Sequence, residues 1–467
     1  MNRWIQTFFA DKHEGFAHLW GAMEDKIPAG IQYSARAAYL YSLHELGAPQ
    51  MFFDEWMQSL RSSPFAASRA SNALEEAIGS GFDAWFLKSG VQISAEQESL
   101  IRQIGISRSQ IFLSLNAATY RRKGDSGLAM LEKLPLNSPF RPWLAQTVAV
   151  GQAKKADLAG AARTLKIFYE PWLQVTKDPR KLALHYMEIA RLLYQAGALE
   201  GAISYYEKVP NGIPEYLTAR EELTWCWLRL GQTDKLRGNL ETLTSKALSD
   251  QFQPEAYLVR SISNLKLCYY NEVEKDFASF ISVNRAWAQK IDLALKASEP
   301  PTPRTVDIYS EAAVARVASR EAEIAQLRSL SERSISATIP AVGPQKHWQA
   351  GVKRLELAID TAKKSRADEF RRQWKNDRVT LNEAIRKMQF VKVELLSQVS
   401  ELAARSDGQG DAIVTSASAA QKTPVVSSEQ KKQMSNEGEM VFPFDGVVWA
   451  DEMFRLKSFA KGRCLGQ

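Results

Sequence analysis

The chain has 467 residues, of which 45% are hydrophobic, and a formal net charge of +7. This length exceeds that of a usual single domain, so we expect two or three units. The three cysteines, Cys226, Cys268 and Cys464, show no Cys-x-x-Cys spacing and are too few for a disulfide framework, which excludes a zinc ribbon or a redox motif. No apolar run of about 18 residues occurs, and charges interrupt the N-terminus before a signal-peptide core could form. The chain as written is expected to be soluble and cytoplasmic, or to belong to the periplasm or cell envelope if an export signal was removed.

The positive charge is concentrated in one segment. Between Lys346 and Lys392 there are 13 Lys/Arg and 6 Asp/Glu, an excess that equals the balance of the whole chain. Attraction to an acidic partner should therefore centre on this segment, within a screening length of about 10 Å.

Residues 1–106 are rich in aromatic side chains and indicate several short helices. Leu46-Gly47 is typical of a helix end, and Pro49 of the next helix start. The expected helices are Ile31–Leu46, Gln50–Leu60, Ala70–Ile78 and Ala95–Ile104. We interpret this part as an N-terminal cap of degenerate helix pairs.

Residues 107–297 contain a pattern of helix, glycine turn and helix that recurs. Its clearest copy places apolar residues at i, i+3, i+4 and i+7 before Gly197 and resumes the same spacing after it. The first stripe is Tyr186, Ile189, Ala190 and Leu193, and the second is Ala202, Tyr206 and Val209. Gly231 follows Gly197 by 34 residues, and Ala156 and Asn271 are expected to replace the glycine in two other turns.

This order of residues resembles the tetratricopeptide repeat (TPR) family. Its small residues correspond to Ala190 and Ala202, its turn glycine to Gly197 and its closing proline to Pro214. The resemblance implies an α-solenoid of about five units between residues 108 and 285, with Trp287–Lys296 as a capping helix.

Two long helical patterns follow the Pro-rich residues 298–303. Val306–Ser334 and His347–Ala404 predict an antiparallel helical hairpin over residues 304–404. In the second helix, apolar residues occupy a and d positions of heptads, which indicates a coiled-coil-like seam. These are Leu381, Ala384, Met388, Val391, Leu395 and Leu402.

The end of the chain changes composition twice. Residues 405–439 lack large apolar side chains and predict a flexible linker, whereas residues 440–467 predict an ordered tail. The docking residues of the tail are Phe442, Phe444, Trp449, Met453 and Phe454. Its Phe-Pro-x-x-Gly-x-x-Trp-x-Asp-Glu order and near-terminal Cys464 are similar to tails of exported bacterial TPR proteins. Such a tail could pack on its own chain or on a partner.

No motif for catalysis occurs in the sequence. The five histidines have no metal-binding spacing, Gly79-Ser-Gly81 lacks a third glycine, and a Gly-x-Ser-x-Gly elbow is missing. We therefore expect no catalytic residue, metal, cofactor or small-molecule substrate.

The TPR resemblance implies a concave groove lined by the first helix of each unit. By register, its partner-binding residues are Arg122, Lys154, Arg191, Tyr194, Gln195, Trp225, Arg229 and Tyr269. Cations beside aromatic rings suit an acidic segment or a C-terminal carboxylate. The alternative is that the tail of the chain fills this groove.

The basic helix 363–378 places Phe370 and Trp374 at i and i+4 among cations. This arrangement could bind nucleic acid or an anionic membrane, although acidic residues interrupt it and the rings could equally serve in packing. Cys226 and Cys268 are expected to be buried thiols, or a disulfide if their Cα atoms lie within about 7 Å.

The sequence thus predicts an all-α, non-catalytic scaffold that holds partner proteins in a larger assembly of the bacterial cell envelope. The alternatives are a peptide-recognising adaptor that uses the groove, and a protein that binds nucleic acid or membrane through residues 363–378.

Overall fold

A computed structural model describes residues 13–120, 124–304, 308–332 and 344–405, together with Met453, Phe454, Leu456 and Cys464. Within these residues every regular element is a helix, which confirms the predicted all-α class. Nearly all of the predicted linker lies outside the described residues. So do Arg122 and three docking residues of the tail, Phe442, Phe444 and Trp449.

The chain forms two compact units. Unit 1 comprises Met1–Thr176 and Val306–Phe370, and unit 2 comprises Lys177–Thr305 and Arg371–Gln467. Helix α21 (Pro344–Arg405) contributes its first part to unit 1 and its second part to unit 2. The five-part division that we expect from composition stays a prediction.

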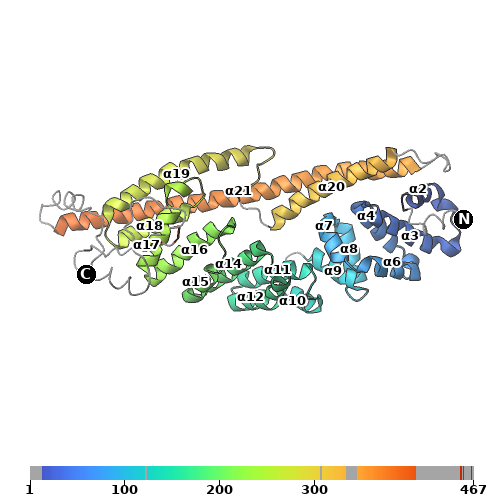
Figure 1. The fold of residues 1–467 in the computed structure, drawn as a ribbon, viewed down its shortest axis with the longest axis horizontal. Coiled ribbons are helices and arrows are strands. Elements are labelled where there is room, and N and C mark those ends of the chain that lie inside the picture. Colours follow the sequence, from blue (N-terminus) through green and yellow to red (C-terminus); the bar gives the residue numbers. More distant parts are fainter. Residues whose placement is uncertain are drawn as a thin grey trace. The chain divides into compact units, whose positions relative to one another are not determined.

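Unit 1 begins with short helices whose positions were largely predicted (Figure 1). These are α2 (His13–Met23), α3 (Gln32–Glu45), α4 (Pro49–Leu60), α5 (Ser63–Ala66), α6 (Arg69–Gly79), α7 (Phe82–Ser89) and α8 (Ala95–Ile104). Pro49 stands at the first position of α4, and the Ser94 side chain caps α8 together with Gln97. Of the seven, α2, α5 and α7 were not expected from the sequence.

The aromatic residues of this part form a core. The ring of Trp56, which is fully buried, lies 5.6 to 6.1 Å from the rings of Phe52, Phe82 and Phe112. These residues come from α4, α7 and α9 (Gln110–Thr119), so the aromatic side chains join helices of this part.

Unit 1 continues with further helices and a π-helical segment. They are α9 (Gln110–Thr119), α10 (Gly124–Lys133), α11 (Phe140–Lys154), α12 (Leu158–Thr164), the π segment Leu165–Tyr169, α13 (Glu170–Thr176) and α20 (Ile308–Glu332).

Helix α20 runs antiparallel to the first part of α21. Glu321 pairs with Lys363 at 3.6 Å, and Arg328 pairs with Glu356, so residue numbers rise on one helix as they fall on the other. The predicted hairpin is therefore present, but only over this part of α21.

Unit 2 contains helical hairpins that stack in sequence. The helices are α14 (Pro179–Gln195), α15 (Leu199–Tyr206), α16 (Glu215–Leu230), α17 (Thr233–Leu243), α18 (Pro254–Lys266) and α19 (Tyr270–Lys296). Each of the helices α14 to α18 contacts the next one, and α14 also contacts α16, as α16 contacts α18 (Figure 1). A core of small and large apolar residues, including Ala190, Ala202, Tyr206 and Leu223, lies between them.

Four helical hairpins among the described residues turn with the same backbone geometry, which also occurs at Gly47 between α3 and α4. Ala156, Gly197, Gly231 and Cys268 each have a positive φ, between 58° and 80°. In all four, the next residue's N–H donates to a carbonyl five residues before it. The prediction that Asn271 takes this position is wrong, because α18 ends at Lys266 and Asn271 already lies in the first turn of α19.

Helix α19 is also longer than predicted. It is one helix of 27 residues, so Trp287–Lys296 is its second half and not a separate capping helix. Trp287 and Ile291 on this half are buried.

The second part of α21 packs on α18 and α19. Ala384, Met388, Val391 and Leu395 lie in one core cluster with residues of those two helices, such as Leu258 and Phe280. Five of the six predicted heptad residues are buried, and Leu402 is partly exposed. The expected partner was wrong: α18 and α19 cover this part of α21, whereas the ion pairs of α20 given above are with its first part.

Candidate protein-interaction site

The predicted groove residue Arg191 of α14 forms an ion pair with Glu222 of α16, a residue that was not predicted for the groove. Arg191 donates to both carboxylate oxygens of Glu222, at 2.8 and 2.6 Å, and the Tyr206 hydroxyl donates to Glu222 at 2.9 Å. The Glu222 carboxylate raises the pKa of Arg191, and burial raises the pKa of Tyr206. The positive charge of Arg191 is thus already neutralised within the chain.

Tyr194, Gln195 and Arg229 form the more open part of this face. The Arg229 guanidinium lies 5.0 Å from the centre of the Tyr194 ring. Arg229 and Gln195 are both exposed. An exposed planar cation on an aromatic ring can receive a carboxylate by charge-assisted hydrogen bonds.

Trp225 lies where α21 covers the face. Its Nε1 donates to Glu255 on α18 at 2.8 Å, and Lys387 Nζ of α21 lies 5.5 Å from its ring. Lys387 is also 4.0 Å from the second oxygen of Glu255. At the Trp225 end the face is therefore covered by α21, and not by the tail that one alternative expected there.

The remaining groove residues are not part of this cluster. Tyr269 follows α18, and the Arg237 guanidinium lies 5.2 Å from its ring. Lys154 is exposed at the last position of α11 in unit 1, and Arg122 lies outside the described residues.

A buried carboxylate that was not predicted from the sequence links α16 to α18. Glu221 on α16 accepts the N–H groups of Glu255 and Ala256 at 2.9 and 3.0 Å and so caps α18, whose own preceding residue Gln253 makes no side-chain cap. Burial raises the pKa of Glu221 to about 8. The only sequence signal was an acidic residue at an otherwise apolar helix position.

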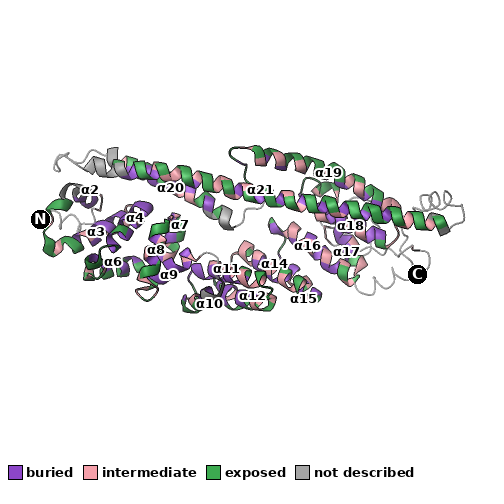
Figure 2. Cartoon of the chain, turned by 180° about the vertical axis from the view of Figure 1, so that it is seen from behind, coloured by how far each residue is buried: buried purple, intermediate pink, exposed green. Residues whose placement is uncertain are grey.

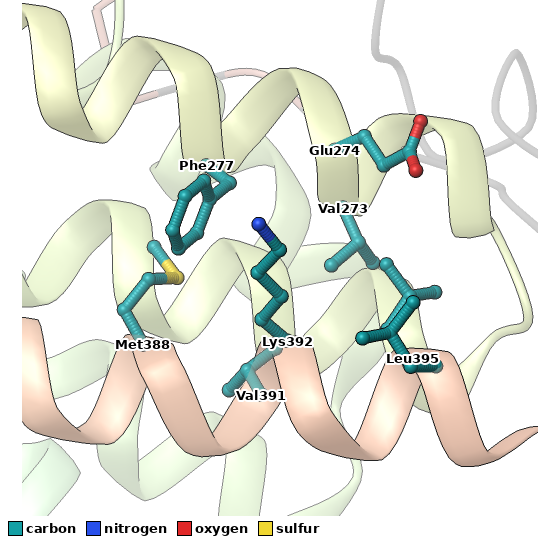
Figure 3. A pocket seen from close by; sticks show the side chains of 8 residues that line it. Val273, Glu274, Phe277, Met388, Val391, Lys392 and Leu395 are labelled. Carbon is teal, nitrogen blue, oxygen red and sulfur yellow. The ribbon is translucent and has the colours of Figure 1, made fainter.

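A pocket lies between α19 and the second part of α21 (Figure 3). Its volume is about 240 Å³. Apolar side chains from both helices line it, with charged groups on either side: Val273, Glu274, Phe277, Met388, Val391, Lys392, Leu395 and Leu396. Lys392 Nζ lies 4.8 Å from the centre of the Phe277 ring.

Exposed apolar side chains continue from this pocket along α21. Phe390, Val393 and Leu396 follow one another at intervals of three residues, so they share one helix face, and they are 66%, 64% and 59% exposed. We call them the α21 strip. Figure 2 shows that many residues of α21 are exposed. Leu396 also lines the pocket, so the strip and the pocket are continuous.

Of the predicted tail residues, Met453 and Phe454 are described, and Phe454 packs in unit 2. Its ring lies 5.3 Å from that of Tyr216 in an edge-on arrangement and 5.1 Å from the Arg220 guanidinium. Its N–H donates to Thr242 Oγ1 at 3.0 Å. Phe454 thus docks on its own chain.

The cysteines pair in a way that the sequence did not indicate. Cys268 and Cys464 form a disulfide with Cα atoms 5.2 Å apart, and Cys226 is a free, buried thiol. Burial raises the pKa of Cys226 to about 11. A bond between Cys226 and Cys268 is therefore excluded in this structure.

The aromatic residues of the basic helix 363–378 serve in packing. Trp374 is 1% exposed and donates from Nε1 to the carbonyl oxygen of Pro301 at 2.9 Å. Phe370 is also buried. Neither ring is presented for stacking on a base.

Within the described part of the chain, no group of three or more His, Cys, Asp or Glu side chains could hold a metal ion. The helices of the same part include none that is long and apolar enough to cross a membrane. No protein-family model matches the chain, and no curated protein matches it either.

Proposed function

We propose that this protein is a non-catalytic scaffold that holds other proteins, built on TPR-like helical hairpins. The sequential stacking of α14 to α18 supports the TPR-like reading, as do the positive-φ turns at Gly197 and Gly231, 34 residues apart. We place the scaffold in a larger assembly of the bacterial cell envelope. The disulfide between Cys268 and Cys464 favours such an oxidising compartment.

The observation that carries this proposal is the continuity of the α21 strip with the pocket. Monomeric proteins rarely expose contiguous large apolar side chains without a role in binding. The partner is a protein segment with one large apolar side chain for the pocket and further apolar residues for Phe390 and Val393. Lys392 and Glu274 at the pocket favour a partner that carries charges of both signs beside that anchor.

The proposal is tested by Leu396→Asp in the full chain, with Leu357→Asp as the matched control. Leu357 lies on the same helix in unit 1 and is 70% exposed, so the two substitutions have similar effects on folding. Proteins captured from a native lysate are identified by mass spectrometry. We expect Leu396→Asp to lose at least one specific partner that Leu357→Asp retains. Retention of every partner by both variants would contradict the proposal.

A second candidate is a peptide-recognising adaptor that uses Tyr194, Gln195 and Arg229. The exposed Arg229 guanidinium on the Tyr194 ring favours an acidic or C-terminal peptide there. Arg229→Glu should then abolish capture of an acidic partner, whereas Arg229→Lys should weaken it because lysine cannot form two parallel hydrogen bonds. Equal capture of the acidic partner by the parent chain, Arg229→Glu and Arg229→Lys would contradict the adaptor and would not bear on the scaffold.

A further inference from the structure

The turn between α18 and α19 carries a cysteine where the two preceding hairpins carry glycine. Cys268 has φ +58°, compared with +80° for Gly197 and +69° for Gly231. The backbone hydrogen bonds are the same in kind: Cys268 N–H donates to Leu265 O at 3.0 Å, and Tyr269 N–H donates to Asn264 O at 2.9 Å.

A side chain at this position is unfavourable, because an L-residue with positive φ brings its Cβ close to backbone atoms. Glycine would serve the turn better. Ala156 shows that a turn of this kind tolerates a side chain, but the side chain of Cys268, unlike that of alanine, has a specific role in this structure. For Cys268 that role is the bond to Cys464, which closes a sequence separation of 196 residues.

The same tail makes a second, non-covalent contact with unit 2. Phe454 lies against Tyr216 and Arg220 of α16 and donates its N–H to Thr242 of α17. We call Tyr216, Arg220 and Thr242 the Phe454 site. Phe454 also has a positive φ, of 63°, which is uncommon for a bulky residue.

The ring contacts and the hydrogen bond of Phe454 offset only part of the entropy lost when this residue is held at its site. The disulfide compensates for the remainder, because it keeps Phe454 near its site at a high effective concentration. Both cysteines are only partly buried, so a reductant can reach the bond.

We propose that the Phe454 site is a binding site for the chain's own C-terminal tail, and that the Cys268–Cys464 disulfide is a redox-controlled link that keeps it occupied. A dithiol reductant opens the link in two steps. Its first thiolate attacks one sulfur, which breaks the bond between the cysteines and forms a mixed disulfide. Its second thiol then attacks that mixed disulfide and releases the reductant in oxidised form. Cys268 and Cys464 gain two electrons and two protons and become thiols.

Opening the link lets Phe454 leave its site and exposes Tyr216 and Arg220. This inference does not rest on the α21 strip, so either can fail without the other.

The matched variants follow from the turn geometry. Cys268→Gly removes the disulfide and gives the turn the residue that its φ favours, so the hairpin is expected to keep its fold. Cys268→Ala removes the same bond but keeps the unfavourable φ, and its melting temperature should be lower than that of Cys268→Gly.

The test uses the full chain, purified without reductant, and dithiothreitol as the dithiol. Alkylation followed by mass spectrometry should label neither Cys268 nor Cys464 before reduction and both after it, with Cys226 labelled only on unfolding. Amide exchange of the peptide that contains Phe454 should accelerate at least tenfold in the reduced protein and in Cys268→Gly, while α18 and α19 exchange as before. Labelling of Cys464 before reduction would overturn the proposal. So would equal protection of the Phe454 peptide with and without the bond.

Discussion

Arg320 and Glu323 form an ion pair on α20 that is almost completely removed from solvent. Arg320 Nη1 lies 2.8 Å from Glu323 Oε2, and the two side chains are 0% and 1% exposed. Glu323 Oε1 also accepts the N–H groups of Gln50 and Met51 at 3.0 Å each, and Arg320 donates to Gly90 O at 3.2 Å. A residue of α20 thereby caps α4, so this pair joins distant segments of unit 1.

Arg320→Met should destabilise unit 1 by about 3–5 kcal/mol, because it leaves the Glu323 carboxylate buried without its cation. Burial already raises the pKa of Glu323 while Arg320 is present. The free energy of unfolding is measured by chemical denaturation, followed by circular dichroism and by amide exchange in α4 and α20.

The control for this prediction is Arg328→Met. The side chains of Arg328 and Glu356 are 57% and 45% exposed, so loss of that pair should cost less than about 1 kcal/mol. Similar small losses in both variants would mean that the buried pair contributes little to the stability of unit 1.

The turns show what the sequence could and could not predict. Gly197 and Gly231 were identified because glycine both interrupts the helical period and allows a positive φ. Ala156 was found by register alone. Cys268 was missed because neither its residue type nor its spacing marks a left-handed turn, and asparagine three residues later was the more usual choice.

Substitutions at the positive-φ position should lower the free energy of unfolding in one turn and raise it in another. Gly231→Ala should cost about 1 kcal/mol, although space for a Cβ is available, because φ is +69°. Ala156→Gly should stabilise by up to about 1 kcal/mol, because φ there is +64°. Thermal melting of each variant against the parent chain is the measurement. A stabilising Gly231→Ala would show that this turn does not need a positive φ.

Helix α21 shows a second limit of sequence reasoning. The heptad pattern correctly predicted that Leu381, Met388 and Leu395 are buried. It could not predict what covers them, because an apolar stripe specifies a face and not its partner. The same limit applies to the groove. The repeat register predicted Arg191 as a groove residue, but it could not predict the ion pair with Glu222, which lies 31 residues further along the chain.

Trp374→Phe should destabilise unit 2 by about 1–2 kcal/mol, since it removes a buried hydrogen bond and leaves Pro301 O without that donor. Phe252, Trp287 and Leu381 surround the ring in the same core cluster, so the smaller ring also leaves space. Phe390→Leu on the same helix is the control, because Phe390 is 66% exposed and its change should stay within about 0.5 kcal/mol. Denaturant unfolding of the two variants distinguishes them; equal stabilities would contradict a packing role for Trp374.

The last prediction concerns His185 on α14, whose pKa burial lowers to about 4. In the unfolded chain its pKa is about 6.5, so between these values the unfolded state binds more protons than the folded state. Stability from His185 is therefore present above pH 6.5 and is lost as the pH falls towards 4. Asp276 acts in the opposite direction, because burial raises its pKa to about 6 and its contribution falls as the pH rises from its usual 3.8.

Because the two effects oppose one another in the parent chain, only a comparison with His185→Leu isolates the histidine. At pH 4.5 the parent should have lost about 2–3 kcal/mol more, relative to pH 7.5, than the variant has. Denaturant unfolding of both proteins at the two pH values measures this difference. An identical pH dependence of the parent and the variant would mean that His185 binds its proton as readily in the folded chain as in the unfolded one.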